Sequence, residues 1–353
     1  MTDINPNDIS ALEHMTGRTE KIAITAHMRP DGDAVGSCIA LYHCLKDIGR
    51  DAFIVLPDAS PDYLGFITST VEAGHFLDWE GNEDEARRAL SGCGLLFSLD
   101  YNAFHRTGKM EEFLSGMKVP KVLIDHHLNP ERDQFSLVFS ETGVSSTAEY
   151  LYHILMAASR YRGNAKMLPP ASATALMTGM TTDTNNFANS VFPSTLRMAS
   201  SLLEAGVDRD MIISHLYNEY REGRVRLMGE LLYRNMKITD DGVAYMILDR
   251  ETISRYGLKE GDTEGFVNIP LSIGKVRMSC FFKEDTDRIR VSLRSKKGIS
   301  ANRCAALYFH GGGHELAAGG KLSVPDDVGS VREVAAYAEK ATHEFMNMNK
   351  NEA

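Results

Sequence analysis

Cysteine is scarce in this chain and is not arranged for disulfide or zinc chemistry. The five cysteines, Cys38, Cys44, Cys93, Cys280 and Cys304, are odd in number and never stand at C-x-x-C spacing. A disulfide framework and a zinc knuckle are therefore both excluded. A reducing cytoplasm fits this pattern, because disulfide-dependent proteins belong to oxidising compartments.

Long apolar runs and a targeting signal are also missing. No apolar run approaches the roughly 20 residues that a membrane-spanning helix needs. The first ten residues, MTDINPNDIS, have neither a basic region nor an apolar stretch that would suggest secretion. We therefore expect a cytoplasmic protein with no membrane partner.

Basic residues are not in excess. The 38 Lys and Arg stand against 48 Asp and Glu, which gives a formal net charge of −10. A general polyanion-binding surface is thereby excluded, and we expect no long nucleic acid as a partner. The 353 residues are 43% hydrophobic and 24% charged, which is typical of a well-packed globular protein of two domains.

The first half of the chain alternates strand-like and helical patterns. Four segments have the pattern of buried strands: 21–27, 51–57, 94–100 and 119–127. Helical periodicity covers three more: 34–49, 146–160 and 171–180. The alternation predicts an α/β fold with a parallel sheet and helices on both faces.

The second half begins with a mostly helical stretch and then becomes rich in strands. Strands are predicted at 243–249, 275–285 and 287–295, the last two as a hairpin, followed by helices at 300–308 and 330–347. We therefore expect a catalytic domain over 1–190, a helical connector over 191–236 and a smaller α/β domain over 237–353.

Acidic and imidazole side chains stand at the ends of several predicted elements. They are His27, Asp31, Asp33, Asp100, Asp125, His126, His127 and Asp183. Taken singly, a strand-end Asp is usually a helix cap or a turn residue, and a His pair is usually a surface or packing feature. In a parallel sheet, however, all the strand ends face one crevice, which would bring these side chains together.

Several aspartates in one crevice need cations to balance their charge. Two carboxylates about 4 Å apart repel by roughly 4 kcal/mol at an effective dielectric of 20. Two divalent cations would neutralise four aspartates, so the sequence predicts a dinuclear metal site. Carboxylate and imidazole ligands without thiolate favour Mn²⁺, with Mg²⁺, Co²⁺ and Zn²⁺ as alternatives. The chemistry of such a site is phosphate ester hydrolysis.

Three motifs, taken together, carry a family resemblance. HMRPDGDAVGS (27–37), LIDHH (123–127) and GGGHELAAGG (311–320) occur in this order over nearly the whole chain. They resemble the DHH phosphoesterase family with its associated C-terminal domain, and no departure is visible at the core positions. The resemblance implies an active-site cleft between the two domains.

The resemblance also implies roles for the acidic and imidazole side chains. One ion would be held by His27, Asp31 and Asp100. The other would be held by Asp33, Asp100, His126 and Asp183, so that Asp100 bridges the two. A metal-bridging hydroxide would be the nucleophile.

Further residues have implied or open roles around this site. By the resemblance, Asp125 would orient the histidines, and His127 would face the phosphate as an electrostatic stabiliser or proton donor. Arg106 either contacts a substrate phosphate or ties its own loop to a carboxylate. Tyr101 and Phe187 could stack on a base, although each also fits the hydrophobic core.

The glycine cluster of the second half is a candidate substrate-binding region. It contains too many glycines for the interior of a strand or helix, and successive free N–H groups would form an anion nest. The candidate contacts are Arg294, Ser295, Gly312, Gly313 and His314. Arg294 suits a bidentate phosphate contact. The alternative is a glycine-rich turn beside a solvated basic edge.

Within the resembled family, the length and motifs of this chain point to a compact bacterial branch of oligoribonucleases. We expect a phosphodiesterase that hydrolyses short RNA and linear dinucleotides such as pApA to mononucleotides. The alternative enzyme is a phosphomonoesterase that converts 3′-phosphoadenosine 5′-phosphate to AMP, and one chain could do both. The non-enzyme alternative is a nucleotide-binding regulator. We also allow for a homodimer, although no sequence pattern supports one.

Overall fold

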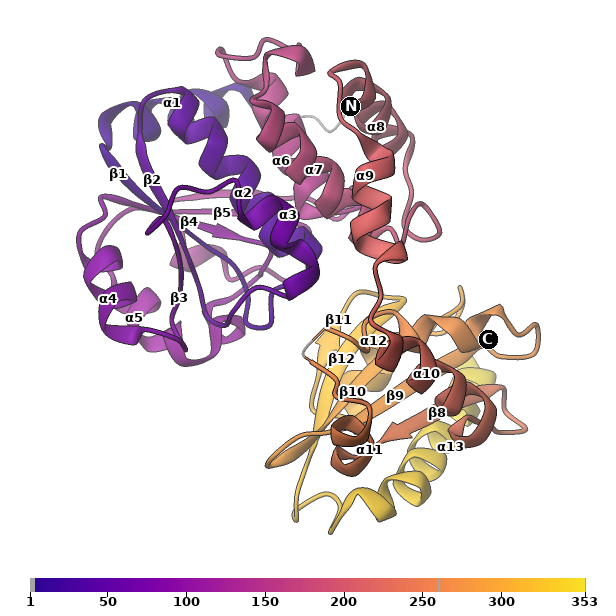
Figure 1. The fold of residues 1–353 in the computed structure, drawn as a ribbon. Helices are drawn as coiled ribbons and strands as arrows, with labels where there is room; N and C mark the ends of the chain where they lie inside the picture. Colours follow the sequence, from indigo (N-terminus) through magenta and orange to yellow (C-terminus); the bar gives the residue numbers. More distant parts are fainter. Residues whose placement is uncertain (1–3, 260, 353) are drawn as a thin grey trace. The chain divides into compact units, whose positions relative to one another are not determined.

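The computed structural model describes residues 4–259 and 261–352, so that residues 1–3, 260 and 353 lie outside the described part of the chain. Figure 1 shows the elements, which divide into two compact units. The first unit ends at Glu219 and the second begins at Tyr220. This division falls inside the predicted connector, residues 191–236, so each unit contains part of that stretch.

The first unit is built on a parallel sheet with the strand order β3-β2-β1-β4-β5-β6. Its strands are β1 (Lys21–Thr25), β2 (Asp51–Leu56), β3 (Phe76–Asp78), β4 (Leu95–Leu99), β5 (Lys121–Asp125) and β6 (Leu137–Ser140). The predicted parallel sheet is confirmed, although the sequence patterns did not indicate the short edge strands β3 and β6. The order reverses between β1 and β4, and such sheets bind ligands at the carboxyl ends of the strands beside this point.

Helices cover both faces of this sheet, as predicted (Figure 1). The helices of this unit are α1 (Pro6–Arg18), α2 (Gly32–Asp47), α3 (Gly65–Thr68), α4 (Glu83–Ser91), α5 (Glu111–Gly116), α6 (Thr147–Ala157), α7 (Pro170–Asp183), α8 (Pro193–Glu204) and α9 (Arg209–Ile213). Alternate strand residues separate the two cores, because successive side chains point to opposite faces. Ile22 and Ile24 pack with α2, α6 and α7, whereas Ala23 packs with α4 and α5.

Helix α2 begins and ends where its local sequence dictates. Asp31 caps it, because Asp31 Oδ1 accepts hydrogen bonds from the N–H groups of Asp33 at 3.0 Å and Ala34 at 3.1 Å. After the helix, Gly49 takes a left-handed φ of 73°, which glycine adopts without a steric penalty. The cap fixes the loop that joins β1 to α2, and this loop carries part of the predicted metal site.

Two glycines let α2, α6 and α7 approach one another closely. A Cβ atom on Gly36 of α2 would lie 2.6 Å from the carbonyl oxygen of Ala175 in α7. A Cβ atom on Gly179 of α7 would lie 2.7 Å from the Cβ of Ala148 in α6 and 2.9 Å from Oδ1 of Asp33. Side chains at these positions would push the helices apart. The glycines therefore help to bring the end of α7 next to the start of α2.

The second unit contains a mixed sheet with the order β11-β12-β10-β9-β8-β7. Its strands are β7 (Lys237–Ile238), β8 (Val243–Leu248), β9 (Met278–Glu284), β10 (Arg288–Ser295), β11 (Gly312–Gly313) and β12 (Ala317–Ser323). Its helices are α10 (Glu222–Glu230), α11 (Arg250–Arg255), α12 (Ala301–Tyr308) and α13 (Val334–Glu352). Strands β9 and β10 pair antiparallel, which confirms the predicted hairpin.

The glycine cluster forms strands, so the expectation that it has too many glycines for a strand interior is wrong. Gly312 and Gly313 make up β11, and Gly319 and Gly320 lie within β12. Main-chain crowding explains Gly313 and Gly320. A Cβ atom on Gly320 would lie 2.3 Å from the carbonyl oxygen of Phe309. Glycine inside a strand is typical of such a close approach by another segment of backbone.

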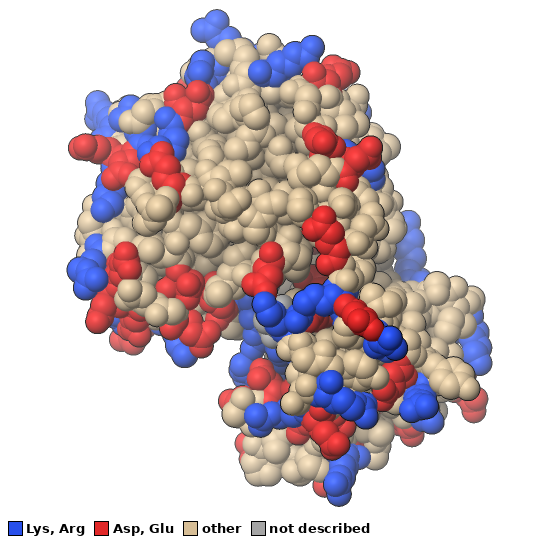
Figure 2. Space-filling model, viewed as in Figure 1, with Lys and Arg blue, Asp and Glu red and all other residues tan. Residues whose placement is uncertain are grey.

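Charged side chains of both signs are interspersed over the face of the molecule in Figure 2. Acidic side chains gather over α4 and α5, whose first turns carry Glu83, Asp84, Glu85, Glu111 and Glu112. In the described part of the chain, every helix is too short or too polar to cross a bilayer.

Candidate metal centre

The predicted metal ligands lie together at the carboxyl-end edge of the first sheet. His27 follows β1, Asp100 follows β4, and His126 follows β5. Asp31 and Asp33 stand at the start of α2, and Asp183 is the last residue of α7. Most of these side chains are buried, with Asp31 and Asp183 partly exposed. The strand-end pattern and the helix packing thus bring side chains from four separate segments to one place.

Asp100 stands between imidazoles on two sides. Its Oδ2 lies 3.4 Å from Nε2 of His27, whereas its Oδ1 lies 3.5 Å from Nε2 of His126. Two ligand atoms that each lie about 2.1 Å from one ion are separated by about 3.0–3.5 Å at ordinary coordination angles. These separations are those expected for two ligands of one ion. One oxygen of Asp100 could therefore bind an ion together with His27, and the other oxygen could bind a second ion together with His126.

The predicted ligands form two groups of donor atoms that share Asp100, and a third group joins Asp100 to Asp125 and His127. In the first group, the donor atoms of His27, Asp31 and Asp100 all lie within 4.8 Å of one another. The second group joins Asp100 to Asp33 and His126 within the same limit. Asp183 extends this second group, because its Oδ2 lies 3.5 Å from Nε2 of His126. These atoms are carboxylate oxygens and imidazole nitrogens, a donor set that suits hard or borderline divalent cations.

The charges in this cluster also favour cation binding. Burial raises the pKa of Asp33 well above its usual value, and the neighbouring charges of Asp100, Asp183 and Asp31 raise it further. Asp183 stands at the C-terminal end of α7, where the helix dipole is negative and disfavours another negative charge. A divalent cation would relieve both unfavourable interactions.

Asp100 behaves differently because histidines surround it. Burial by itself would raise the pKa of its carboxyl group, but a hydrogen bond from His27 and the charges of His127, His27 and His126 outweigh burial. The pKa of Asp100 therefore lies below its usual range, and the group stays ionised. Asp100 also has a left-handed φ of 62°, a conformation that costs a non-glycine residue about 1–3 kcal/mol and that clusters at functional sites.

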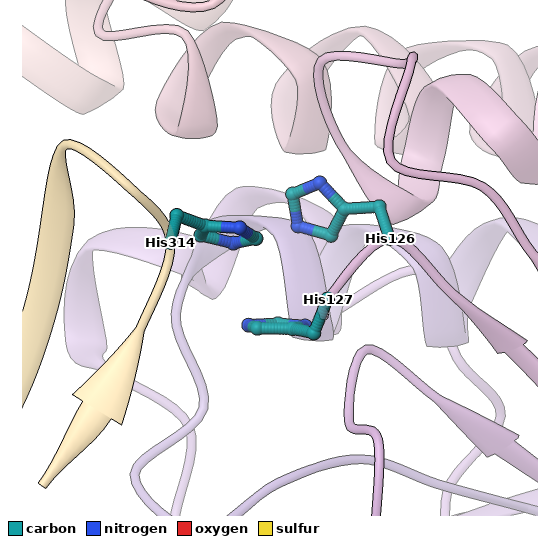
Figure 3. Close-up of side chains that lie close together, drawn as sticks. All are labelled: His126, His127 and His314. Atoms are coloured by element: carbon teal, nitrogen blue, oxygen red, sulfur yellow. The ribbon is translucent and has the colours of Figure 1, made fainter. Parts of the chain in front are cut away.

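Asp125 orients the ring of His127. The Oδ1 atom of Asp125 lies 2.8 Å from Nδ1 of His127, and the Asp125 side chain is fully buried at the end of β5. Figure 3 shows the ring of His127 beside that of His126, with centroids 4.9 Å apart in an edge-to-face arrangement. The third labelled ring, His314, belongs to the second unit. The carboxylate–imidazole pair fixes the orientation of the His127 ring.

Arg106 lies close to His27. Its carbonyl oxygen accepts a hydrogen bond of 2.8 Å from the N–H group of Met28, which joins the two loops. Burial lowers the pKa of the His27 imidazole, but the hydrogen bond to Asp100 and the charges of the neighbouring aspartates raise it above its usual value, and the positive charge of Arg106 acts against this rise. The loop connection is therefore made by the backbone of Arg106, and its guanidinium adds positive charge beside the cluster.

The two aromatic candidates differ in accessibility. Tyr101 is fully buried, and its hydroxyl group donates a 2.7 Å hydrogen bond to Ser98 Oγ, so it belongs to the core. Phe187 is only partly buried and packs against the main core of the first unit. The guanidinium carbon of Arg209 lies 5.7 Å from the centre of the Phe187 ring.

In the second unit, several backbone N–H groups of the glycine cluster already have hydrogen-bond acceptors. The N–H of Gly313 donates to Asn302 Oδ1 at 2.8 Å, and the N–H of His314 donates to the carbonyl of Ala317 at 2.7 Å. The prediction of a nest of free N–H groups is therefore wrong at these two positions, because the N–H groups donate to a main-chain carbonyl and to the Asn302 side chain. Gly312 lies beside Gly313 in β11 and pairs with Gly319 of β12.

Arg294 and Ser295 end β10, next to this cluster. Arg294 pairs with Ala317 of β12, and its Nη1 donates to the carbonyl of Leu293 at 2.9 Å. The hydroxyl group of Ser295 is buried and donates to the carbonyl of Ile299 at 2.6 Å. Ser295 thus has a structural role in the turn that follows β10.

Comparisons with known proteins agree with the division of the chain into two units. Residues 21–180 match the DHH family, N-terminal domain, and residues 240–341 match the DHHA1 domain. Proteins called bifunctional oligoribonuclease and PAP phosphatase NrnA are similar to this chain. The one from Bacillus subtilis is 27% identical, over 86% of this chain and 90% of that protein. The one from Thermus thermophilus is 29% identical, over 91% and 90%.

A solved structure extends the similarity to the whole fold. An exopolyphosphatase-related protein from Bacteroides fragilis is 34% identical to this chain and has a TM-score of 0.88. The match covers 99% of each chain.

Proposed function

The chain belongs to the DHH family and is a metal-dependent hydrolase, and from this premise we propose that it hydrolyses short oligoribonucleotides and linear dinucleotides such as pApA to mononucleotides. The observation that carries the proposal is the position of Asp100, whose Oδ2 lies 3.4 Å from Nε2 of His27 and whose Oδ1 lies 3.5 Å from Nε2 of His126. The names of the relatives from B. subtilis and T. thermophilus support short RNA as the substrate.

The proposal assigns the two ligand groups to two divalent ions. His27, Asp31 and Asp100 hold one ion. Asp33, Asp100, His126 and Asp183 hold the other. We propose Mn²⁺ for both, because imidazole and carboxylate donors occur together without thiolate. When bound, such a pair of ions lowers the pKa of a water molecule and neutralises charge on the reacting phosphate.

His127 and Arg106 act on the substrate in this proposal. Asp125 holds Nδ1 of His127, so that the ring is positioned to donate a hydrogen bond to the phosphate or a proton to the leaving oxygen. Arg106 adds positive charge at the loop beside His27 and stabilises the phosphate electrostatically.

Removal of phosphate from 3′-phosphoadenosine 5′-phosphate is the second candidate activity. The relatives named above are called bifunctional, and the same ligand groups would serve a phosphomonoester. The regulator alternative has less support, because a protein that only binds nucleotides does not need carboxylate and imidazole donors gathered at metal-binding distances. Substrate binding by Arg294 and His314, a homodimer and a cytoplasmic location stay predictions.

A substrate panel tests the proposal. Purified protein is assayed with di- to ten-mer RNA, pApA, cyclic dinucleotides and 3′-phosphoadenosine 5′-phosphate, each with Mn²⁺, Mg²⁺, Co²⁺ or Zn²⁺. We expect the highest kcat/KM for the shortest linear RNA with Mn²⁺, and a loss of all turnover with chelator. Absence of product from every substrate and metal would contradict an enzymatic function.

A further inference from the structure

The first turn of α6 contacts two carboxylates of the candidate metal centre. Thr147, the first residue of α6, is fully buried. Its hydroxyl group donates a 2.9 Å hydrogen bond to Oδ1 of Asp100, and its backbone N–H donates a 2.7 Å hydrogen bond to Oδ2 of Asp33. One residue therefore contacts two of the carboxylates that are assigned to the ions.

The same turn holds both oxygens of Asp33. While Thr147 binds Oδ2, the N–H of Ala148 donates a 2.9 Å hydrogen bond to Oδ1. These N–H groups belong to the start of the helix, where no intrahelical acceptor is available and the helix dipole favours a negative charge. Asp33 is thus fixed at both oxygens by main-chain donors, and Asp100 is fixed relative to Asp33 by the Thr147 hydroxyl group.

A buried hydrogen-bond network holds this turn in place. Glu149, also fully buried, accepts hydrogen bonds from the N–H of Ser145 at 2.9 Å and from the hydroxyl of Thr195 at 2.6 Å. Ser146 caps the helix by accepting from the N–H of Glu149 at 3.0 Å. Thr195 belongs to α8, so the turn is connected to a neighbouring helix as well as to its own. Such connections reduce the freedom of Thr147 to move away from the carboxylates.

We propose that Thr147 is a positioning residue that sets the spacing of Asp100 and Asp33 and thereby raises the affinity of the centre for divalent ions. The inference depends on the proposed metal-binding role of these two carboxylates. In the absence of ions, the carboxylates repel each other, and the two donors of Thr147 oppose their separation. Partners behind the ligands of a metal site typically change its metal affinity by about 10–100-fold.

The test compares variants of the full-length protein in Mn²⁺ titrations followed by calorimetry and by the EPR signal of free Mn²⁺. Thr147→Val keeps the shape of the side chain and removes only the hydroxyl group. We expect it to bind Mn²⁺ about 10–100-fold more weakly than wild type. Thr147→Ser keeps the hydroxyl group, and we expect it to restore most of the lost affinity.

Thr178→Val is the matched control. Thr178 is also fully buried, but its hydroxyl group donates to the carbonyl of Thr174 in its own helix, α7, at 2.9 Å. We expect this variant to keep the wild-type Mn²⁺ affinity. Thermal unfolding without metal shows whether each variant is folded, and if Thr147→Val does not fold, Thr147→Ala takes its place with Thr178→Ala as its control.

The outcomes separate the inference from the function on which it depends. Failure of the wild-type protein to bind Mn²⁺ would contradict the proposed metal centre itself. Binding by the wild type, with equal affinity in Thr147→Val, would overturn the role of Thr147 alone. The same conclusion would follow if Thr147→Ser and Thr147→Val were equally weakened, because the effect would then not depend on the hydroxyl group.

Discussion

At the scale of single residues, Glu149 shows how a buried carboxylate can remain charged. Burial would raise its pKa, but hydrogen bonds from His153, Ser145, Ser194 and Thr195 outweigh burial and lower the pKa to about 2. Because folding lowers this pKa from its ordinary 4.5, ionised Glu149 stabilises the folded state. The stabilisation is complete above about pH 5 and is lost as the pH falls toward 2.

We therefore predict that Glu149→Gln changes how the free energy of unfolding depends on pH below about pH 5. The wild type should exceed the variant in free energy of unfolding at pH 7, by a margin on the order of 3 kcal/mol at most. This margin should shrink steadily between pH 5 and pH 3 as the Glu149 contribution is lost. Urea unfolding of both proteins across this range measures it, and a margin that stays constant with pH would refute the assignment.

The position of each residue in the fold determines whether its place in the site could be predicted from the sequence. Strand-end residues such as Asp100 and His126 could be predicted to converge, because a parallel sheet directs all its carboxyl ends to one edge. Thr147 could not be predicted in this way, since its contact with Asp100 spans 47 positions of sequence and depends on how α6 packs. The Ser146-x-x-Glu149 spacing signals a helix start, but that signal says nothing about which carboxylates the helix contacts.

At the scale of elements, the close packing of α6 and α7 depends on Gly179. We predict that Gly179→Ala lowers the free energy of unfolding by about 1–3 kcal/mol, because its methyl group would overlap Ala148 and the Asp33 carboxylate. Gly17→Ala in α1 is the control, since no atom lies within 4 Å of a Cβ atom there. It should be neutral or slightly stabilising. Urea unfolding measures both, and equal stability of the two variants would argue against the packing role.

Some strands could be predicted from the sequence, whereas others could not. The central strands β1, β2, β4 and β5 could be predicted, because both faces of each are covered and their residues are therefore continuously apolar. The edge strand β3 has only three residues, all partly exposed, so it lacks such a run. Strand β12 was missed for a different reason: its Gly319 and Gly320 do not favour strand formation, and only at Gly320 does the close approach of another segment exclude a side chain.

At the scale of the whole molecule, each unit has its own hydrophobic cores. The clusters around Ile24 and Trp79 consist of residues of the first unit, and those around Phe282 and Phe281 consist of residues of the second. Separate cores favour two cooperative unfolding transitions rather than one. The proposed metal ligands all belong to the first unit, so ion binding should stabilise that unit selectively.

Calorimetry of the full chain with and without Mn²⁺ tests this expectation. Free Mn²⁺ at a hundred times its dissociation constant should stabilise the first unit by about 2.7 kcal/mol and raise only one of the two transition temperatures. Asp100→Asn should abolish the shift, and it should still fold because Asn tolerates the left-handed φ of 62° at this position. An equal shift of both transitions, or a shift that persists in Asp100→Asn, would count against the proposed site.

The crowded backbone at β11 and β12 affects how relatives of this chain are recognised from sequence. Gly311 and Gly320 are required because main chains cross there without room for a methyl group. A paralogue that had lost catalysis would still need these glycines in order to fold. These two glycines therefore indicate that the second domain can fold. They do not indicate whether a relative hydrolyses a substrate.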